Sequence, residues 1–414
     1  MQKRRVVIAA SERMSKLPPY LFAEMDRLKT AALRRGVDLI DFGIGDPDEP
    51  TPPEIVEAAR EALGRPEFHR YPRNAGSDFF IEAAMRWMER EFSVRMGDDL
   101  AIGAVIGTKE GLAHVPLVFC SSGDVVLVPN PGYPVYRAAS ILADAVPVDV
   151  PLHRENGFLP DLEALDRAAL RSARVLFVNY PNNPTGAVMS HDVMKQVVDF
   201  ARREDLLLVS DNSYSHIRFD GAKPASFLSI EGASGICLEF HSLSKTFNMT
   251  GWRVGFVVGG RNLVRAFMSA KENIDSGVFT AIQAAAARAL DLPAAGLAGR
   301  LETYGRRREI LVSGLANLGW DVFDSQGTFY VWAAVPRGWT SVDFAGRLVS
   351  QAGIAVAPGV GFGSWGEGYV RFALTVSEDM IMKALGRLEQ MEFCSIKGRA
   401  AALAGRRRSC RRES

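Results

Sequence analysis

The chain has 414 residues, of which 47% are apolar and 23% charged, with 49 basic and 48 acidic side chains. This length suggests two or three domains, and the apolar fraction excludes a largely disordered chain. The net charge of +1 is unevenly distributed, because residues 397–414 carry seven basic residues and one acidic residue, leaving −5 on the rest. A mildly acidic body excludes a basic nucleic-acid-binding surface.

Targeting and cross-linking signals are lacking in the sequence. The longest apolar runs are as short as strands, far below the roughly 20 residues that cross a bilayer. The first apolar stretch ends after five residues at Ser11, too early for an export signal. The cysteines have no paired spacing, which argues against a disulfide framework or a zinc site: Cys120, Cys237, Cys394 and Cys410. We expect a cytoplasmic protein without membrane or nucleic-acid partners.

An early helix is predicted to begin at Thr51, which can cap it, with Glu54 completing a capping box. Short β-branched segments then alternate with helical ones, such as residues 191–204. The predicted strands are residues 125–128, 175–179, 206–210, 236–240 and 254–258. Because these strands are apolar almost throughout, they predict an α/β domain whose mainly parallel sheet is covered on both faces. Ligands bind at the carboxyl edge of such a sheet.

The C-terminal part changes character. Helices are predicted at residues 283–290 and 304–318, and short strands return at 329–333 and 369–374. This pattern predicts a second, smaller domain, followed by a basic, solvated tail at residues 397–414.

The segment His241-Ser-Leu-Ser-Lys-Thr-Phe-Asn-Met-Thr-Gly-Trp-Arg253 concentrates candidate chemistry. Lys245 follows a predicted strand, and Arg253 comes eight residues later. Partial desolvation and a second cation both lower the pKa of a lysine and favour its nucleophilic amine. Together with Ser242 and Ser244, Arg253 can bind a phosphate dianion through charge-assisted hydrogen bonds. The alternative is an ordinary lysine in a polar surface loop.

This segment resembles the lysine motif of class I aminotransferases, which are fold-type I enzymes that use pyridoxal phosphate. The resemblance extends from about residue 17 to residue 389, and the motifs follow in the family's order. Besides the lysine segment they are Phe42-Gly-Ile-Gly-Asp-Pro47, Gly107-Thr-Lys-Glu-Gly111, Pro131-Gly-Tyr-Pro134, Asn179-Tyr-Pro-Asn-Asn-Pro-Thr-Gly186, Ser210-Asp-Asn-Ser-Tyr214 and Val370-Arg-Phe372. The resemblance implies the fold-type I architecture: a mainly parallel central sheet with helices on both faces, plus a smaller α+β domain.

The same resemblance divides the chain. Residues 1–45 would join the small domain, 46–290 would form the large cofactor domain, and 291–396 would complete the small domain. Residues 397–414 would lie outside both.

Several residues are implied to bind the cofactor. Lys245 would hold it covalently, while Thr108 and Lys109 would contact its phosphate at a helix N-terminus, alongside Ser242, Ser244 and Arg253. An ordinary helix start is the alternative interpretation of Thr108 and Lys109.

Four other residues are implied to contact the cofactor ring. Tyr133 would stack on it, and Asp211 would keep its nitrogen protonated, which makes the ring an electron sink. Asn183 and Tyr214 would bond its oxygen. Without the family, these residues are typical of a packing tyrosine, a helix cap, an Asx turn and a core tyrosine.

The substrate and the partner subunit are implied at two further positions. Arg371 resembles the arginine that binds the substrate α-carboxylate in a bidentate fork, with a structural salt bridge as the alternative. Tyr71 resembles the tyrosine donated across a dimer interface to the phosphate, so a homodimer with shared active sites is expected. A surface tyrosine is the alternative.

Among subgroups, the closest resemblance is to LL-diaminopimelate aminotransferases. It rests on Leu17-Pro-Pro-Tyr-Leu-Phe22, the phosphate loop, the lysine segment from Glu239 and Asp275-Ser-Gly-Val-Phe279. It implies that Tyr20 lines the substrate pocket, and that Gly45 lies near the substrate carboxylate with Asn183 and Arg371, its missing side chain permitting close approach.

Two departures from that subgroup bear on the substrate. After Tyr71 the chain has Arg73 and Asn74, and no acidic residue before Asp78. His216 stands where related sequences usually have Glu. An arginine in place of an acid favours an anionic or neutral substrate side chain.

The expected activity is transfer of an amino group, with LL-diaminopimelate as favoured donor and 2-oxoglutarate as acceptor, in a ping-pong cycle. Lys245 would move the α-proton as general base and acid. The alternatives are another donor such as aspartate or alanine, a C–S β-lyase that releases pyruvate, or a non-catalytic binding protein. The histidines have no metal-ligand spacing, so no metal site is expected.

Overall fold

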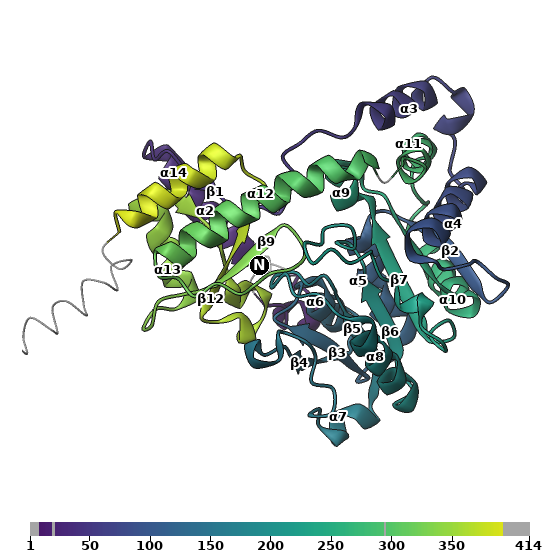
Figure 1. Cartoon of the computed structure of the whole chain (residues 1–414). Coiled ribbons are helices and arrows are strands. Elements are labelled where there is room, and N and C mark those ends of the chain that lie inside the picture. Colours follow the sequence, from purple (N-terminus) through teal and green to yellow (C-terminus); the bar gives the residue numbers. More distant parts are fainter. Residues whose placement is uncertain (1–7, 19–20, 294, 392–414) are drawn as a thin grey trace, which may run out of the picture.

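The computed structural model describes residues 8–18, 21–293 and 295–391 (Figure 1). The predictions for Tyr20 and for the tail at residues 397–414 fall outside these ranges.

A seven-stranded sheet forms the core of the larger lobe. Its order is β2-β8-β7-β6-β5-β3-β4, and only β8 runs antiparallel to its neighbours. The strands are β2 Leu100–Val105, β3 Val125–Asn130, β4 Val146–Pro151, β5 Ala173–Val178, β6 Leu207–Asp211, β7 Cys237–Ser242 and β8 Gly255–Gly260. The predicted mainly parallel sheet is confirmed, and the five predicted strands are displaced by no more than two residues at either end.

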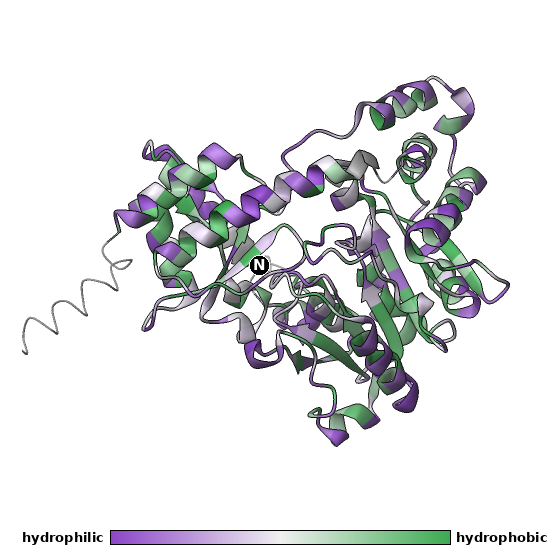
Figure 2. Cartoon of the chain, viewed as in Figure 1, coloured by the Kyte–Doolittle hydropathy of each residue, from purple (hydrophilic) through white to green (hydrophobic). Residues whose placement is uncertain are grey.

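Both faces of this sheet are covered by helices. Successive residues of one strand pack into different cores, as Val126 and Leu127 do, because side chains alternate across a sheet. The strands therefore show as hydrophobic ribbons, and the surrounding helices have polar outer faces (Figure 2). The helices of this lobe are α3 Pro53–Leu63, α4 Asp78–Phe92, α5 Thr108–Phe119, α6 Val135–Leu142, α7 Arg167–Arg171, α8 His191–Arg203, α9 Leu243–Thr246, α10 Arg261–Lys271 and α11 Thr280–Leu290.

The smaller lobe contains segments from both ends of the chain. β11 Ala357–Pro358, β12 Tyr369–Ala373 and β9 Tyr330–Ala334 form an antiparallel sheet, while β1 Ile40–Asp41 pairs in parallel with β10 Ile354–Ala355. Figure 1 shows β1 and α2 (purple) beside α14 (yellow). The helices of this lobe are α2 Leu21–Arg34, α12 Ala295–Asn317, α13 Ser341–Arg347 and α14 Glu378–Glu389, whereas the short α1 Glu12–Ser15 contacts α6 of the large lobe.

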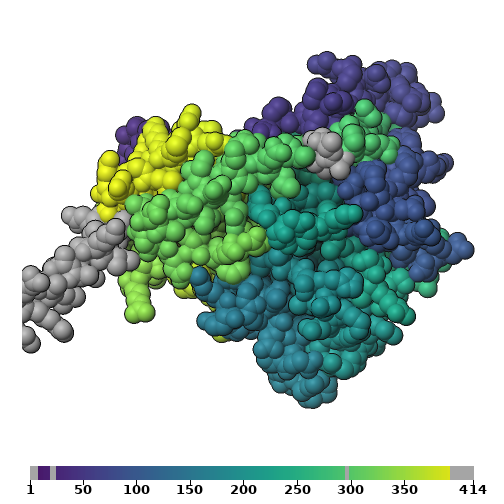
Figure 3. Space-filling model, viewed as in Figure 1, coloured from purple at the N-terminus to yellow at the C-terminus, as the bar shows by residue number. Residues whose placement is uncertain are grey.

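A long helix links the two lobes. α12 runs along both of them, and the two lobes meet over a broad front in the space-filling view (Figure 3). Its Arg307 donates two hydrogen bonds to the Asp48 carboxylate and one to the Leu374 carbonyl. This side chain therefore ties the helix to both the N-terminal segment and the small lobe. The proposed division of the chain at residues 45 and 290 stays a prediction.

The predicted role of Thr51 is wrong. α3 begins at Pro53, and its N-cap position is held by Pro52, without a side-chain cap. The Thr51 hydroxyl instead donates to the Asn248 carbonyl oxygen, 2.6 Å away. A tertiary hydrogen bond has therefore replaced the local cap. No helix in the described ranges is long and apolar enough to cross a membrane.

Candidate active site

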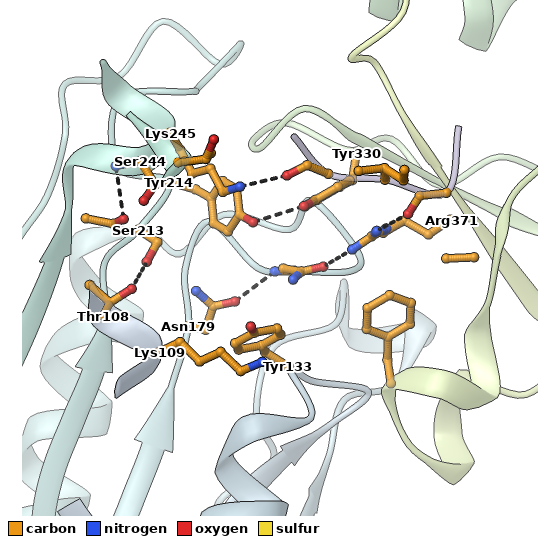
Figure 4. A pocket seen from close by; sticks show the side chains of 18 of the residues that line it. Thr108, Lys109, Tyr133, Asn179, Ser213, Tyr214, Ser244, Lys245, Tyr330 and Arg371 are labelled. Atoms are coloured by element: carbon orange, nitrogen blue, oxygen red, sulfur yellow. Dashed lines mark hydrogen bonds between the residues drawn. The ribbon is translucent and has the colours of Figure 1, made fainter. Parts of the chain in front are cut away.

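A cavity of about 480 Å³ opens between the two lobes at the carboxyl edge of the large sheet (Figure 4). The topology explains this position, because chain segments that leave parallel strands emerge at the same edge. Asp211 ends β6, Ser242 ends β7, and Tyr133 follows β3. The small lobe closes the opposite side. The predicted site residues that line the cavity are Gly45, Thr108, Lys109, Tyr133, Asn183, Asp211, Tyr214, Ser242, Ser244, Lys245, Arg253 and Arg371.

Lys245 lies in the short helix α9 and reaches toward the small lobe. The Ser242 hydroxyl accepts a hydrogen bond from the Ser244 amide and caps this helix. The Lys245 amine donates to the Gly45 carbonyl oxygen, 2.7 Å away. Burial is the main cause that lowers the pKa of Lys245 to about 8; Asp46 opposes this shift, and Arg371 and Arg253 contribute to it. A fraction of this lysine is therefore a neutral nucleophile near neutral pH, unlike a lysine in a surface loop.

Asp211 is a buried carboxylate without a cationic partner among the described residues. Its oxygens accept hydrogen bonds from the Tyr136 hydroxyl at 2.7 Å and the Ser213 hydroxyl at 2.5 Å. Burial raises the pKa of Asp211, and these two hydrogen bonds act in the opposite direction. The charge is thus held by neutral donors, which leaves it available to a cationic group in the cavity.

The start of α5 forms a polar cradle. Gly107, at φ +77°, caps the helix, and a Cβ there would lie 2.5 Å from a guanidinium nitrogen of Arg253. A side chain at this position would displace that arginine. The Thr108 hydroxyl lies 3.2 Å from that of Ser213. Amides at a helix N-terminus, hydroxyls and a guanidinium are a donor set suited to a phosphate group.

Arg371 lies on the small-lobe side, on β12, and is 4% exposed. Its guanidinium donates to the Asn183 side-chain oxygen at 2.8 Å and to the Gly43 carbonyl oxygen at 3.0 Å. Its Nε has no hydrogen-bond partner, and no carboxylate of the described chain lies within ion-pair distance. The structural salt bridge considered for Arg371 is therefore absent from the described residues, and its charge remains available to an anionic ligand.

A hydrogen-bonded chain of amides connects the two sides of the cavity. The Asn179 side chain donates to the Asp211 carbonyl oxygen and accepts from the Asn183 amide, both at 2.8 Å. Asn183 in turn bonds Arg371. These bonds fix the spacing between the Asp211 segment and the arginine.

The missing side chain of Gly45 also has a reason within the chain itself, while its predicted proximity to the substrate stays a prediction. A Cβ there would overlap the Tyr330 hydroxyl. Gly45 therefore permits the approach of another residue of the chain, and its carbonyl oxygen is held by Lys245.

Two predicted residues lie away from the cavity. Tyr71 does not line it and is 90% exposed on this chain. His216 is buried against Trp87 and Phe92, with its Nε2 3.5 Å from a Glu91 oxygen, and does not line the cavity. The departure at His216 therefore alters the core of the large lobe.

The residues that the prediction missed at the site include Asn179 and three others. Tyr136 holds Asp211, Ser213 links Asp211 to Thr108, and Tyr330 lines the cavity beside Arg371. Tyr136 and Tyr330 occur in apolar segments that are typical of core packing. Ser213 lies within a recognised motif, two residues after Asp211, and this spacing was a usable signal.

This donor set fits pyridoxal phosphate. The cavity offers a lysine of lowered pKa, a buried carboxylate with no cationic partner in the described part of the chain, and a phosphate-binding cradle. Bound there, the cofactor would supply an electron sink for a carbanion at the substrate α-carbon. Lys245 would attach it, Asp211 would face its ring nitrogen, and Thr108, Ser244 and Arg253 would hold its phosphate.

Comparisons with known proteins agree with this chemistry. The family described as aminotransferase class I and II matches residues 37–388. LL-diaminopimelate aminotransferase of Aquifex aeolicus is 45% identical over 383 residues, covering 92% of this chain and 99% of that protein. The substrate-bound BacF structure from Bacillus subtilis superposes with a TM-score of 0.89 at 35% identity, covering 93% of this chain and 98% of that one.

A Thermus thermophilus aspartate aminotransferase mutant superposes with a TM-score of 0.86 at 31% identity, covering 93% of this chain and all of that one. The family match covers most of the chain, including both sides of the cavity. The chain belongs to the class I and II aminotransferases and is a pyridoxal phosphate-dependent enzyme of fold type I.

Proposed function

We propose that this aminotransferase moves the amino group of LL-diaminopimelate to 2-oxoglutarate, as a step of lysine biosynthesis. The observation that carries the proposal is the pairing of a lysine of lowered pKa on one wall with an arginine on the other that has no carboxylate partner among the described residues. The donor is proposed from the relatives of that name, which match along nearly their whole length at 44–47% identity.

Each wall has its own part in the reaction. Arg371 binds the α-carboxylate of the amino donor, with Asn183 fixing its orientation. Lys245 accepts the proton from the donor's α-carbon and, in the second half of the cycle, returns a proton to the α-carbon of the new amino acid.

The presence of Arg73, where related sequences commonly have an acidic residue nearby, is compatible with an amino donor whose far end carries a positive charge. Arg73 forms an ion pair with Asp78 of the same chain. This pair is exposed, and its two charges cancel. The distal ammonium group of diaminopimelate would therefore not meet an unpaired positive charge there.

A panel of donors tests the assignment. LL-diaminopimelate, aspartate, alanine and an aromatic amino acid would each be supplied with 2-oxoglutarate, and glutamate formation measured. We expect kcat/KM for LL-diaminopimelate to exceed the others by at least about tenfold. A higher value for aspartate or alanine would reassign the donor. With a cysteine conjugate as the substrate, continuous release of pyruvate, thiol and ammonia without an acceptor would indicate a C–S β-lyase.

The two half-reactions would use one site in turn. Initial rates at several fixed concentrations of 2-oxoglutarate should therefore give parallel double-reciprocal lines. Intersecting lines would contradict the ping-pong order.

We also propose a homodimer in which Tyr71 completes the partner's site, because its exposed side chain lies outside its own cavity. Mixing the inactive variants Lys245→Ala and Tyr71→Phe after unfolding and refolding tests this. Heterodimers would contain one intact site, so about a quarter of wild-type activity should return. No recovery would place Tyr71 in its own subunit. The cytoplasmic location stays a prediction.

A further inference from the structure

Tyr330 lies between the cofactor side and the substrate side of the cavity, and no predicted role accounts for it. Figure 4 shows its side chain between Tyr214 and Arg371. It is 3% exposed and comes from β9 of the small lobe. In the register of β9 with β12, Arg371 lies opposite Trp332, and Tyr330 is two residues before Trp332. Since side chains alternate along a strand, Tyr330 and Arg371 share one face of the sheet.

The ring of Tyr330 supports the arginine. The guanidinium carbon of Arg371 lies 3.9 Å from the centre of this ring and 4.8 Å from that of Phe362. A guanidinium that packs over two aromatic rings is favoured by cation–π attraction, which restricts its orientation. This packing orients the edge of the guanidinium without consuming its hydrogen-bond donors.

The hydroxyl of Tyr330 contacts Tyr214 on the cofactor side of the cavity. It lies 3.0 Å from the Tyr214 hydroxyl, and both groups are buried. Burial raises the pKa of Tyr214 well above its ordinary value, and the nearby Tyr330 acts in the same direction. Tyr214 therefore keeps its proton. When the Tyr330 hydroxyl donates to Tyr214, the proton of Tyr214 is free to point elsewhere, and its donor strength increases.

We propose that Tyr330 is a positioning residue that acts on both ends of the active site, through its hydroxyl on Tyr214 and through its ring on Arg371. The proposal rests on the proposed roles of these two residues toward the ring oxygen of the cofactor and the substrate carboxylate. Gly45 belongs to the same arrangement, because any side chain there would displace the Tyr330 hydroxyl.

Two substitutions separate the two actions. Tyr330→Phe removes the hydroxyl and keeps the ring, whereas Tyr330→Leu removes both. The matched control is Tyr304→Phe, which deletes the hydroxyl of a buried small-lobe tyrosine outside the cavity. Thermal unfolding of each loaded protein checks that the variants are folded.

The first readout is the visible absorbance of the protein-bound cofactor as a function of pH. In Tyr330→Phe, Tyr214 becomes a weaker donor, so negative charge on the ring oxygen loses stabilisation and the cofactor retains its proton to higher pH. We expect the midpoint to rise by about 0.5 to 1 pH unit. The control Tyr304→Phe should titrate like the wild type.

The second readout is KM for the amino donor. Tyr330→Phe should change it by less than about twofold, and Tyr330→Leu should raise it about fivefold. An unchanged absorbance midpoint in Tyr330→Phe, or an unchanged KM in Tyr330→Leu, would overturn the proposal. An incorrect donor assignment would show as absent turnover in the wild type, while the absorbance titration remains measurable.

Discussion

The two walls of the cavity carry different chemical groups and are suited to different parts of the reaction. On the large-lobe wall, burial lowers the pKa of Lys245 to about 8, and neutral donors hold the Asp211 carboxylate. On the small-lobe wall, Arg371 keeps its full charge and is held by aromatic rings, an amide and a carbonyl. One wall is thus prepared for covalent attachment and proton transfer, and the other for binding an anion. Substitutions on the large-lobe wall should lower kcat, whereas substitutions on the small-lobe wall should raise KM for the amino donor.

The largest effect is expected for Lys245→Ala. This variant loses both the attachment point and the base for the α-proton, so kcat should fall by about 10⁴-fold. The measurement is glutamate formation from LL-diaminopimelate and 2-oxoglutarate at saturating cofactor. A variant with near wild-type kcat would remove Lys245 from the proton transfer.

Arg371→Lys should produce the opposite pattern. The positive charge stays, but the planar fork that can bind a carboxylate through two nitrogens is lost. We expect KM for the donor to rise about 10- to 100-fold, with a smaller change in kcat. Steady-state kinetics across donor concentration distinguish the two parameters. A loss confined to kcat would show that the two walls do not divide the work in this way.

The lowered pKa of Lys245 predicts how cofactor attachment depends on pH. Its neutral fraction rises about tenfold per pH unit while most of the amine is protonated, and levels off above its pKa of about 8. Stopped-flow absorbance after mixing pyridoxal phosphate with the cofactor-free protein should show that profile. A rate that keeps rising to pH 10 would indicate an ordinary lysine.

The smallest effect is expected for Asn183→Ala. Loss of its hydrogen bond to Arg371 should raise donor KM about fivefold. In the double variant with Arg371→Lys, the increase in donor KM should be smaller than the product of the two single increases, because both substitutions weaken the same contact with the donor carboxylate. Multiplicative effects would show that Asn183 acts independently of the arginine.

Much of the large-lobe wall was predictable because its residues follow strands in short, ordered motifs. Lys245, Asp211 and Thr108 each lie within one such motif, and the parallel sheet brings their strand ends together. The orientation of the small-lobe wall was less predictable. Arg371 stood out as a charge in an apolar strand, but Tyr330 and Tyr136 are indistinguishable from core residues until strand register and helix packing are known.

The local sequence around Thr51 and Gly45 did not reveal the tertiary contacts that these two residues make. Thr51 has the spacing of a helix cap, yet its hydroxyl bonds the Asn248 carbonyl on the lysine segment. The proximity of Gly45 to the substrate stays a prediction, and the structure adds that its missing side chain makes room for the Tyr330 hydroxyl. In both cases the deciding partner lies more than a hundred residues away in the chain.

A single-turnover experiment tests the division of the cavity most directly. Cofactor-loaded protein would be mixed with LL-diaminopimelate in the absence of any 2-oxo acid, and both the cofactor absorbance and the deaminated product would be followed. For the wild type we predict one product molecule per active site and a matching loss of visible absorbance. In Lys245→Ala the absorbance should change much more slowly. In Arg371→Lys the total absorbance change at saturating donor should equal that of the wild type, but saturation should require a higher donor concentration. Product in excess of the active sites, or an equally fast change in Lys245→Ala, would contradict this account.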